Sequence, residues 1–83
     1  MERFKKETKF LIYIGEIPKN KKTFVVDVNT KDLHVLGKIK WHGAWRKYCF
    51  SPEGETIFDK SCLMDVIGVI DELMEKRKKK KEA

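Results

Sequence analysis

The chain has 83 residues, of which 41% are hydrophobic and 39% are charged, and its formal net charge is +6. One small domain fits this length, and the hydrophobic content is too high for a wholly disordered chain. The longest apolar run, residues 10–14, is far shorter than the roughly 18 residues of a membrane span, and no signal peptide is visible. We therefore expect a cytoplasmic domain without a membrane span.

The positive charge is concentrated at the end of the chain. Residues 76–83 hold six basic residues and one acid, so the other residues comprise 13 basic and 12 acidic ones and are nearly neutral. A basic tail attracts nucleic acid or an anionic membrane. Lysines also stabilise the carboxyl end of a helix while remaining solvated, and composition alone favours this second interpretation.

The first third of the chain predicts a frayed start followed by two strands. Residues 1–9 are mostly charged, and we expect them to be frayed. Residues 10–17 favour a strand with apolar side chains on both faces: Phe10, Ile12 and Ile14 on one, Leu11 and Tyr13 on the other. Residues 23–29 alternate strictly, so a second strand is expected to point one face into the core; that face consists of Phe24, Val26 and Val28.

Residues 33–41 favour a third strand, which a tight turn joins to the next. Gly43-Ala44 fits a two-residue type II′ turn, which requires a positive φ at its first residue. In this register the facing pairs are Trp41 with Arg46, Ile39 with Tyr48, Gly37 with Phe50, and Lys40 with Lys47. Arg46 would then either stack on the Trp41 ring or bind an anion at the hairpin end.

A short strand at residues 55–58 and a long helix complete the predicted elements. Asp59 or Ser61 can cap the helix. Apolar residues recur in it at steps of three and four, which is typical of a helix that covers a sheet; they are Leu63, Val66, Ile67, Ile70, Leu73 and Met74. The acidic side chains are expected on its outer face: Asp65, Asp71, Glu72 and Glu75.

These elements predict an α+β fold, an antiparallel β-meander of four to five strands packed against one long C-terminal helix. Residues 10–75 would form the single domain, with a frayed N-terminus over 1–9 and a basic C-terminal tail over 76–83. One helix covers only one face of such a sheet. The other face is therefore expected to meet solvent, a partner or a second copy.

The third strand and its hairpin partner form the candidate binding surface. Residues 37–52 contain both tryptophans and four basic residues but no acid. Basic side chains beside an exposed aromatic ring suit a phosphate backbone with a stacked base, and Lys40 opposite Lys47 is unfavourable unless an anion or acidic partner is bound. The predicted nucleic-acid-binding residues are Lys38, Lys40, His42, Trp45, Arg46 and Lys47. The alternative is a solvated strand face whose lysines prevent edge pairing.

No pattern in the chain predicts catalytic residues, a metal site or a cofactor. His34 and His42 have no acidic partner within residues 33–52, which argues against an acid–base pair. Cys49 and Cys62 lack metal-ligand spacing and are expected to be reduced thiols. Phosphate-loop and dinucleotide-binding patterns are absent. We therefore expect a non-enzymatic binding module.

Residues 36–52, together with Thr56-Ile57-Phe58 and residues 62–67, resemble a family of short uncharacterised proteins from bacterial, archaeal and phage genomes. The likeness covers residues 24–74, and its most specific part is the pattern Trp-x-x-x-Trp-Arg-x-Tyr-Cys-Phe-x-Pro beginning at Trp41. The resemblance implies a phage or mobile-element context without an assigned activity. The predicted architecture is more distantly similar to AP2-type and integrase amino-terminal DNA-binding domains, whose sheets are more basic than this nearly neutral body.

Three function classes remain open from the sequence. The first is nucleic-acid binding through the basic and aromatic sheet face, assisted by the lysine tail. The second is a protein-interaction module, either a phage-type accessory or inhibitor protein or a homodimer, in which acidic groups of the partner meet the same lysines. Contact of residues 76–81 with an anionic membrane is a third option.

Overall fold

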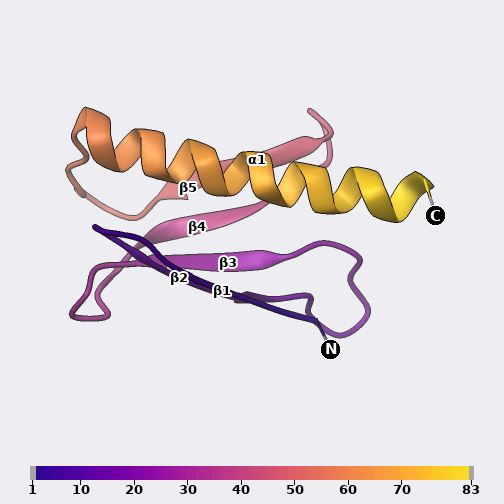
Figure 1. Cartoon of the computed structure of the whole chain (residues 1–83), viewed down its shortest axis with the longest axis horizontal. Coiled ribbons are helices and arrows are strands. Elements are labelled where there is room, and N and C mark those ends of the chain that lie inside the picture. Colours follow the sequence, from indigo (N-terminus) through magenta and orange to yellow (C-terminus); the bar gives the residue numbers. More distant parts are fainter. Residues whose placement is uncertain (1, 83) are drawn as a thin grey trace.

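A computed structural model describes the backbone of residues 2–82 and the side chains of residues 2–79 (Figure 1). The expected basic tail over 76–83 is therefore described only in part, because Ala83 and the side chains of 80–82 lie outside the described residues, as does Met1 of the segment 1–9. The elements are β1 (Arg3–Glu7), β2 (Ile12–Glu16), β3 (Val25–Asn29), β4 (Val35–His42), β5 (Lys47–Pro52) and α1 (Lys60–Glu82).

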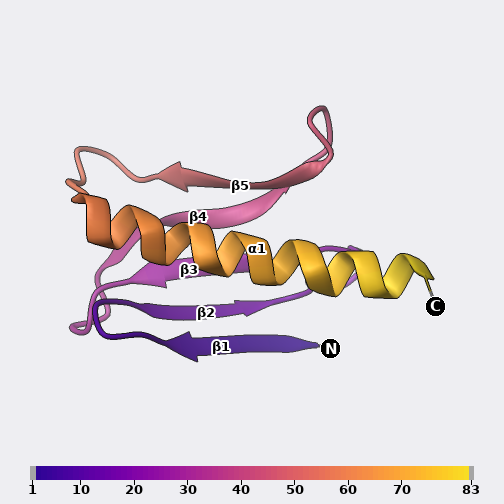
Figure 2. The ribbon, with the colours of Figure 1, turned by 45° about the horizontal axis from the view of Figure 1, so that its top comes forward.

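The five strands form one antiparallel sheet in the order β1-β2-β3-β4-β5, and α1 covers one of its faces (Figures 1 and 2). Figure 2 shows α1 running along the strands, with its carboxyl end at the same end of the molecule as the start of β1. The predicted α+β fold, a meander with one C-terminal helix, is confirmed. The fifth strand, however, comes from the amino terminus and not from residues 55–58.

Strand β1 corrects the expectation that residues 1–9 are frayed. It pairs with β2 over its full length, and Phe4 is buried with its ring edge-on to Phe24 at 6.0 Å between centroids. An edge strand needs an apolar side chain only where it faces the helix, so the single Phe4 among charged neighbours is sufficient. Residues 55–58 form no strand; Phe58 lies edge-on to Phe50, and Ile57 is 93% exposed.

The core lies between α1 and the middle of the sheet. Tyr13 of β2 and Leu11, just before that strand, are buried under α1, whereas Ile14 on the other face is 44% exposed. The face predicted to point into the core is confirmed for Phe24, Val26 and Val28, which are all buried. The alternation breaks at Asn29, which is also buried and lies where the pairing of β3 with β4 shifts register. The complete buried cluster is Phe4, Leu11, Tyr13, Phe24, Val26, Val28, Ile39, Tyr48, Val66, Val69 and Leu73.

The helix begins as predicted but turns a different face to the sheet. The Asp59 carboxylate accepts a hydrogen bond from the Cys62 amide at 2.8 Å, which is an N-cap. The buried line includes Val69, whereas Leu63 and Ile67 are 45% and 53% exposed. Both choices satisfy steps of three and four residues, so periodicity alone did not distinguish them.

Two of the acidic residues expected on the outer face of α1 instead contact the sheet. Asp65 accepts hydrogen bonds from Tyr13 Oη at 2.6 Å and from Thr8 Oγ1 at 2.7 Å. Glu72 accepts one from Lys6 Nζ at 2.9 Å. These side chains lie beside the buried line on the flank of α1 that faces β1 and β2, where polar groups of the sheet edge meet them.

The hairpin of β4 and β5 differs from the predicted register by two residues. The facing pairs are Trp41 with Tyr48, Ile39 with Phe50 and Lys40 with Cys49. Residues 43–46 form a four-residue turn in which Arg46 has the positive φ, 55°, so the predicted type II′ turn at Gly43 is wrong. Because side chains alternate with a period of two, this shift leaves the residues of the two strands on their predicted faces. Trp45 and Arg46, which were expected in the second strand, lie in the turn instead.

Candidate nucleic-acid interface

The sheet face away from α1 divides into a neutralised half and a cationic half. On the β1–β3 side the charges alternate in sign: Arg3 is directly opposite Glu16, and Asp27 Oδ1 lies 3.5 Å from Lys38 Nζ. Lys38 is therefore partly neutralised. The β4–β5 side carries Lys40, His42 and Lys47, all exposed, without a facing acid.

The expected cross-strand pair of Lys40 and Lys47 does not form. Lys40 is opposite Cys49, and Lys47 is opposite His42, because the turn has four residues and not two. The repulsion that the sequence suggested as evidence for a bound anion therefore does not occur as a facing pair. What remains is a cationic strip along β4 and β5, with Glu53 lining the same hollow as Lys38 and Lys40.

Trp45 lies at the tip of this hairpin and is 66% exposed. Its ring meets the His42 ring edge-on at 4.7 Å between centroids. The turn holds Trp45 in place through the Arg46 amide, which donates to the His42 carbonyl at 2.8 Å. Among the described residues no carboxylate pairs with Lys40, Arg46 or Lys47. We name Trp45 and these three cations the hairpin tip cluster.

The cation that stacks on Trp41 is Arg77 of α1, not Arg46. The Arg77 guanidinium carbon lies 4.2 Å from the centre of the Trp41 ring. Trp41 also packs edge-on against Tyr48, at 5.4 Å between centroids. Arg46 instead lines a groove between the hairpin tip and α1, which also holds Trp41 and Arg77.

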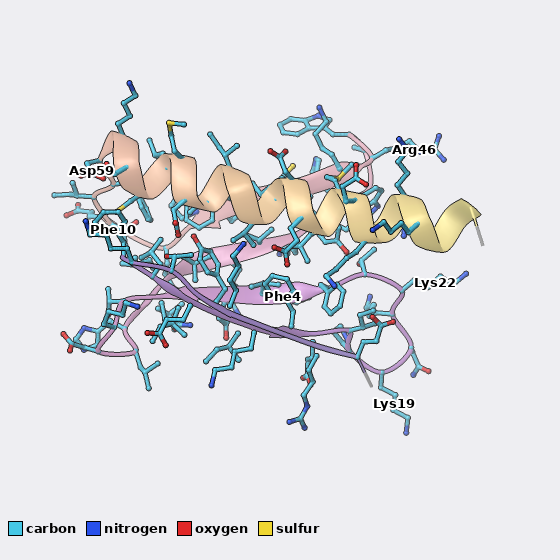
Figure 3. The ribbon with its side chains drawn as sticks, in the orientation of Figure 1. Phe4, Phe10, Lys19, Lys22, Arg46 and Asp59 are labelled. Carbon is cyan, nitrogen blue, oxygen red and sulfur yellow. The ribbon has the colours of Figure 1, made fainter. Side chains whose placement is uncertain are left out.

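Basic residues from three separate segments converge at this end of the molecule. Lys22, in the turn between β2 and β3, lines a small hollow together with Lys76 and Arg77. The neighbouring groove is lined by Trp41, Arg46, Met74, Glu75, Arg77 and Lys78. Figure 3 shows Lys19, Lys22 and Arg46 at the end of the molecule where α1 finishes.

Sequence reasoning missed this convergence, although the topology contains the signal. In a meander every second turn lies at the same end of the sheet, so the turns 18–22 and 43–46 are neighbours. A helix that follows β5 and runs back along it must finish at that end too. We name the set Lys22, Arg46, Lys76, Arg77 and Lys78 the cationic end.

The described residues provide neither a cluster of metal ligands nor a disulfide. No three His, Cys, Asp or Glu side chains gather there as metal ligands would. Both cysteines are free and half-buried. No helix of the described residues has the length and apolarity needed to cross a bilayer.

Comparison with known proteins finds a similar phage protein. The chain is 36% identical over 74 residues to an uncharacterised 9.3 kDa protein of Acholeplasma phage L2, and the alignment covers 88% of this chain and 95% of the phage protein. No protein-family model matches the sequence. No solved structure matches it either.

Proposed function

We propose a nucleic-acid-binding function for this chain, which belongs to one family with the uncharacterised 9.3 kDa protein of Acholeplasma phage L2. The proposed role is non-enzymatic: the hairpin of β4 and β5 contacts the sugar–phosphate backbone and one or more bases. The proposed contact residues are Lys38, Lys40, His42, Trp45, Arg46 and Lys47. The lysines of the last helical turns would add attraction that acts at longer range.

The observation that carries this proposal is the hairpin tip cluster. Trp45 is 66% exposed, and three cations of the same hairpin have no carboxylate partner in the described residues. An exposed indole next to unpaired cations offers a base a stacking surface and its phosphates a counter-charge. A merely solvated strand face would explain the lysines, whereas an exposed indole on the same hairpin also provides a stacking surface for a base.

The neutralised half of the sheet limits where the nucleic acid would lie. Asp27 and Glu16 would repel phosphates on the β1–β3 side. The proposed footprint therefore follows β4, β5 and the turn between them. AP2-type domains, the architectural analogy drawn from the sequence, use the broad face of a sheet instead, so the proposed contact differs from theirs.

Amide-correlation NMR with isotope-labelled protein tests the proposal. A ten-nucleotide oligothymidine strand, its RNA counterpart and a twelve-base-pair duplex are titrated at low salt. We expect the signals of Lys40, Trp45 and Lys47 to move with at least one of these probes. If all three probes leave the hairpin signals unmoved, the proposed function is wrong.

Two variants sharpen this test. Trp45→Ala should weaken binding about tenfold, since stacking of one base on an aromatic ring contributes about 1–3 kcal/mol. Lys40→Gln should weaken binding less and only at low salt. Lys60→Gln is the matched control, because it removes one exposed charge at the start of α1, the end of the helix far from the hairpin tip.

Self-association is the second candidate function, and a separate observation favours it. Apolar side chains are exposed on α1 and the loop before it: Ile57, Leu63, Met64 and Ile67 are 93%, 45%, 59% and 53% exposed. An apolar patch of this kind is typical of an interface. Sedimentation velocity at several concentrations tests it; a dimer that Ile67→Asp dissociates and Trp45→Ala leaves intact would support it.

A further inference from the structure

We propose that the groove between the hairpin tip and the last turns of α1 binds a phosphate group of a nucleic-acid strand, with Arg77 as its principal ligand. This inference rests on the proposed nucleic-acid-binding function and adds a specific anion site to it. The site lies beyond the predicted binding residues, because Arg77 belongs to the helix and was assigned only to a basic tail.

The Arg77 guanidinium lies against the Trp41 ring in the absence of a ligand. It stacks on Trp41 at 4.2 Å, and Trp41 is itself packed against Tyr48. Stacking uses the face of the guanidinium and leaves its N–H edges available for hydrogen bonds. A planar fork held in this way loses little side-chain freedom when it binds the two oxygens of a phosphate.

The hydrogen-bonding capacity of Arg77 is unused in the described structure. No carboxylate of the described residues forms an ion pair with it, and its Nε is buried without a hydrogen-bond acceptor. A buried donor without a partner costs free energy that a bound acceptor restores. An oxyanion in the groove would supply that acceptor once the Arg77 side chain shifts enough to present its Nε edge to the groove.

The charges around Arg77 favour an anion. Arg46 and Lys78 line the same groove, and Lys22 and Lys76 line the adjoining hollow. Glu75 is the one acidic residue among those lining the groove. A cleft with charges mainly of one sign concentrates the opposite ion, and gathered cations are themselves stabilised when an anion joins them.

The groove is also fixed in shape, because its two walls are attached to each other. The amide of Tyr48, in β5, donates to the Met74 sulfur at 3.4 Å. Met74 and Trp41 both line the groove, so the contact that joins β5 to α1 lies next to the proposed site. The site therefore needs no closure of a loop to form.

The exposed indole favours a single strand as the source of the phosphate. Arg46 lines the groove and is the residue after Trp45, so a backbone phosphate in the groove and a base on Trp45 can belong to adjacent nucleotides. Only an unpaired base offers its face to an aromatic side chain. In a duplex the base faces are stacked on each other.

The test combines a direct signal with three variants and uses the oligothymidine ten-mer as its probe. The Nε–Hε signal of Arg77 is followed by NMR, and affinity is measured by fluorescence anisotropy. Arg77→Met should lower affinity about tenfold, and Arg77→Lys should restore only part of it, because lysine lacks the planar fork. Lys79→Gln, which removes a charge two residues further along α1 and outside the groove lining, should lower affinity less than twofold.

The amide spectrum of each variant shows whether it still folds, so that loss of folding is not mistaken for loss of the site. Arg46→Gln is a further test variant, and it leaves the contact between Arg77 and Trp41 intact. We expect it to weaken binding of the ten-mer while the Arg77 signal remains responsive. Equal affinities of the wild type, Arg77→Met and Arg46→Gln would overturn the proposal, as would tighter binding of the twelve-base-pair duplex.

The pattern of shifts distinguishes this failure from failure of the proposed function. Movement of the Lys40, Trp45 and Lys47 signals without any change at Arg77 Nε would contradict the groove site but would still support nucleic-acid binding. Unmoved signals at both places would end both. Vesicles of phosphatidylcholine and phosphatidylserine serve as the third probe; binding to them and not to the ten-mer would assign the cations to a membrane and contradict both proposals.

Discussion

Tyr13 and Asp65 are the residues whose role differs most from what their pattern suggested. Tyr13 is fully buried beneath α1, and its hydroxyl donates to the Asp65 carboxylate. Burial first, and then the hydrogen bond to Asp65 and the negative charge of that carboxylate, raise the pKa of the Tyr13 phenol well above its usual value. The strand pattern showed an apolar residue on each face, and nothing in it indicated that one hydroxyl would meet a helical acid.

This contact predicts a change of stability at high pH. The folded state keeps the Tyr13 proton, whereas the unfolded chain loses it near pH 10, so the stabilisation is complete below pH 10 and falls as the pH rises further. The free energy of unfolding of the wild type, relative to Tyr13→Phe, should therefore fall by about 1.4 kcal/mol between pH 7 and pH 11. Urea unfolding of both proteins measures it, and a constant difference would contradict the account.

At neutral pH, Tyr13→Phe should lower the free energy of unfolding by about 1.5 kcal/mol, because a hydrogen bond to a charged group is lost. Thr8 still donates to Asp65 in this variant, so the carboxylate is not left without any partner. Thr8→Val removes the other donor, and it also removes the Oγ1 that accepts from the Leu11 amide at 3.1 Å, so its effect should be the larger of the two. If neither substitution changed the free energy of unfolding, the hydrogen bonds of Asp65 to the sheet would not stabilise the fold, contrary to this account.

At the scale of elements, side-chain alternation predicted which face of the sheet a residue occupies more reliably than it predicted which residues pair across strands. The β4–β5 register differs from the predicted one by two residues, which changes every pairing partner but keeps the strand residues on their faces, because side chains alternate with a period of two. Only Trp45 and Arg46 left the strand, for the turn. The helical stripe failed in the same way, because a set containing Leu63 and Ile67 and one containing Val69 share the same spacing. Edge strand β1 escaped prediction because only Phe4 among its five residues is buried.

The hairpin register makes a prediction about two glycines. A Cβ at Gly37 would lie 2.5 Å from the Ser51 carbonyl oxygen and 2.7 Å from the Phe50 ring, whereas one at Gly43 would meet no atom within 4 Å. Gly37→Ala should therefore lower the free energy of unfolding by about 2 kcal/mol, and Gly43→Ala should change it by less than about 0.5 kcal/mol. Chemical denaturation measures both, and equal effects would contradict the register.

At the scale of the whole molecule, the meander and the returning helix gather positive charge at one end. The turns that carry Lys22 and Arg46 lie at the end where α1 finishes, so segments with little in common in sequence build one cationic end. The composition revealed the lysine tail, but only the topology reveals that Lys22 and Arg46 lie at the same end of the molecule. The hairpin face was predictable from alternation, whereas the Arg77–Trp41 stack depended on how far α1 extends along the sheet.

The most direct test of the central claim is the dependence of oligonucleotide affinity on salt. The wild-type association constant for the ten-mer is measured by fluorescence anisotropy between 50 and 200 mM salt. If Lys40, Arg46, Lys47 and Arg77 each neutralise one phosphate, the logarithm of this constant should fall against the logarithm of salt concentration with a slope of about −3. The double variant Lys40→Gln/Lys47→Gln should reduce the magnitude of that slope by about half, and Trp45→Ala should leave it unchanged while lowering affinity. A slope near zero, or the same slope in the double variant, would contradict the claim that this hairpin binds nucleic acid.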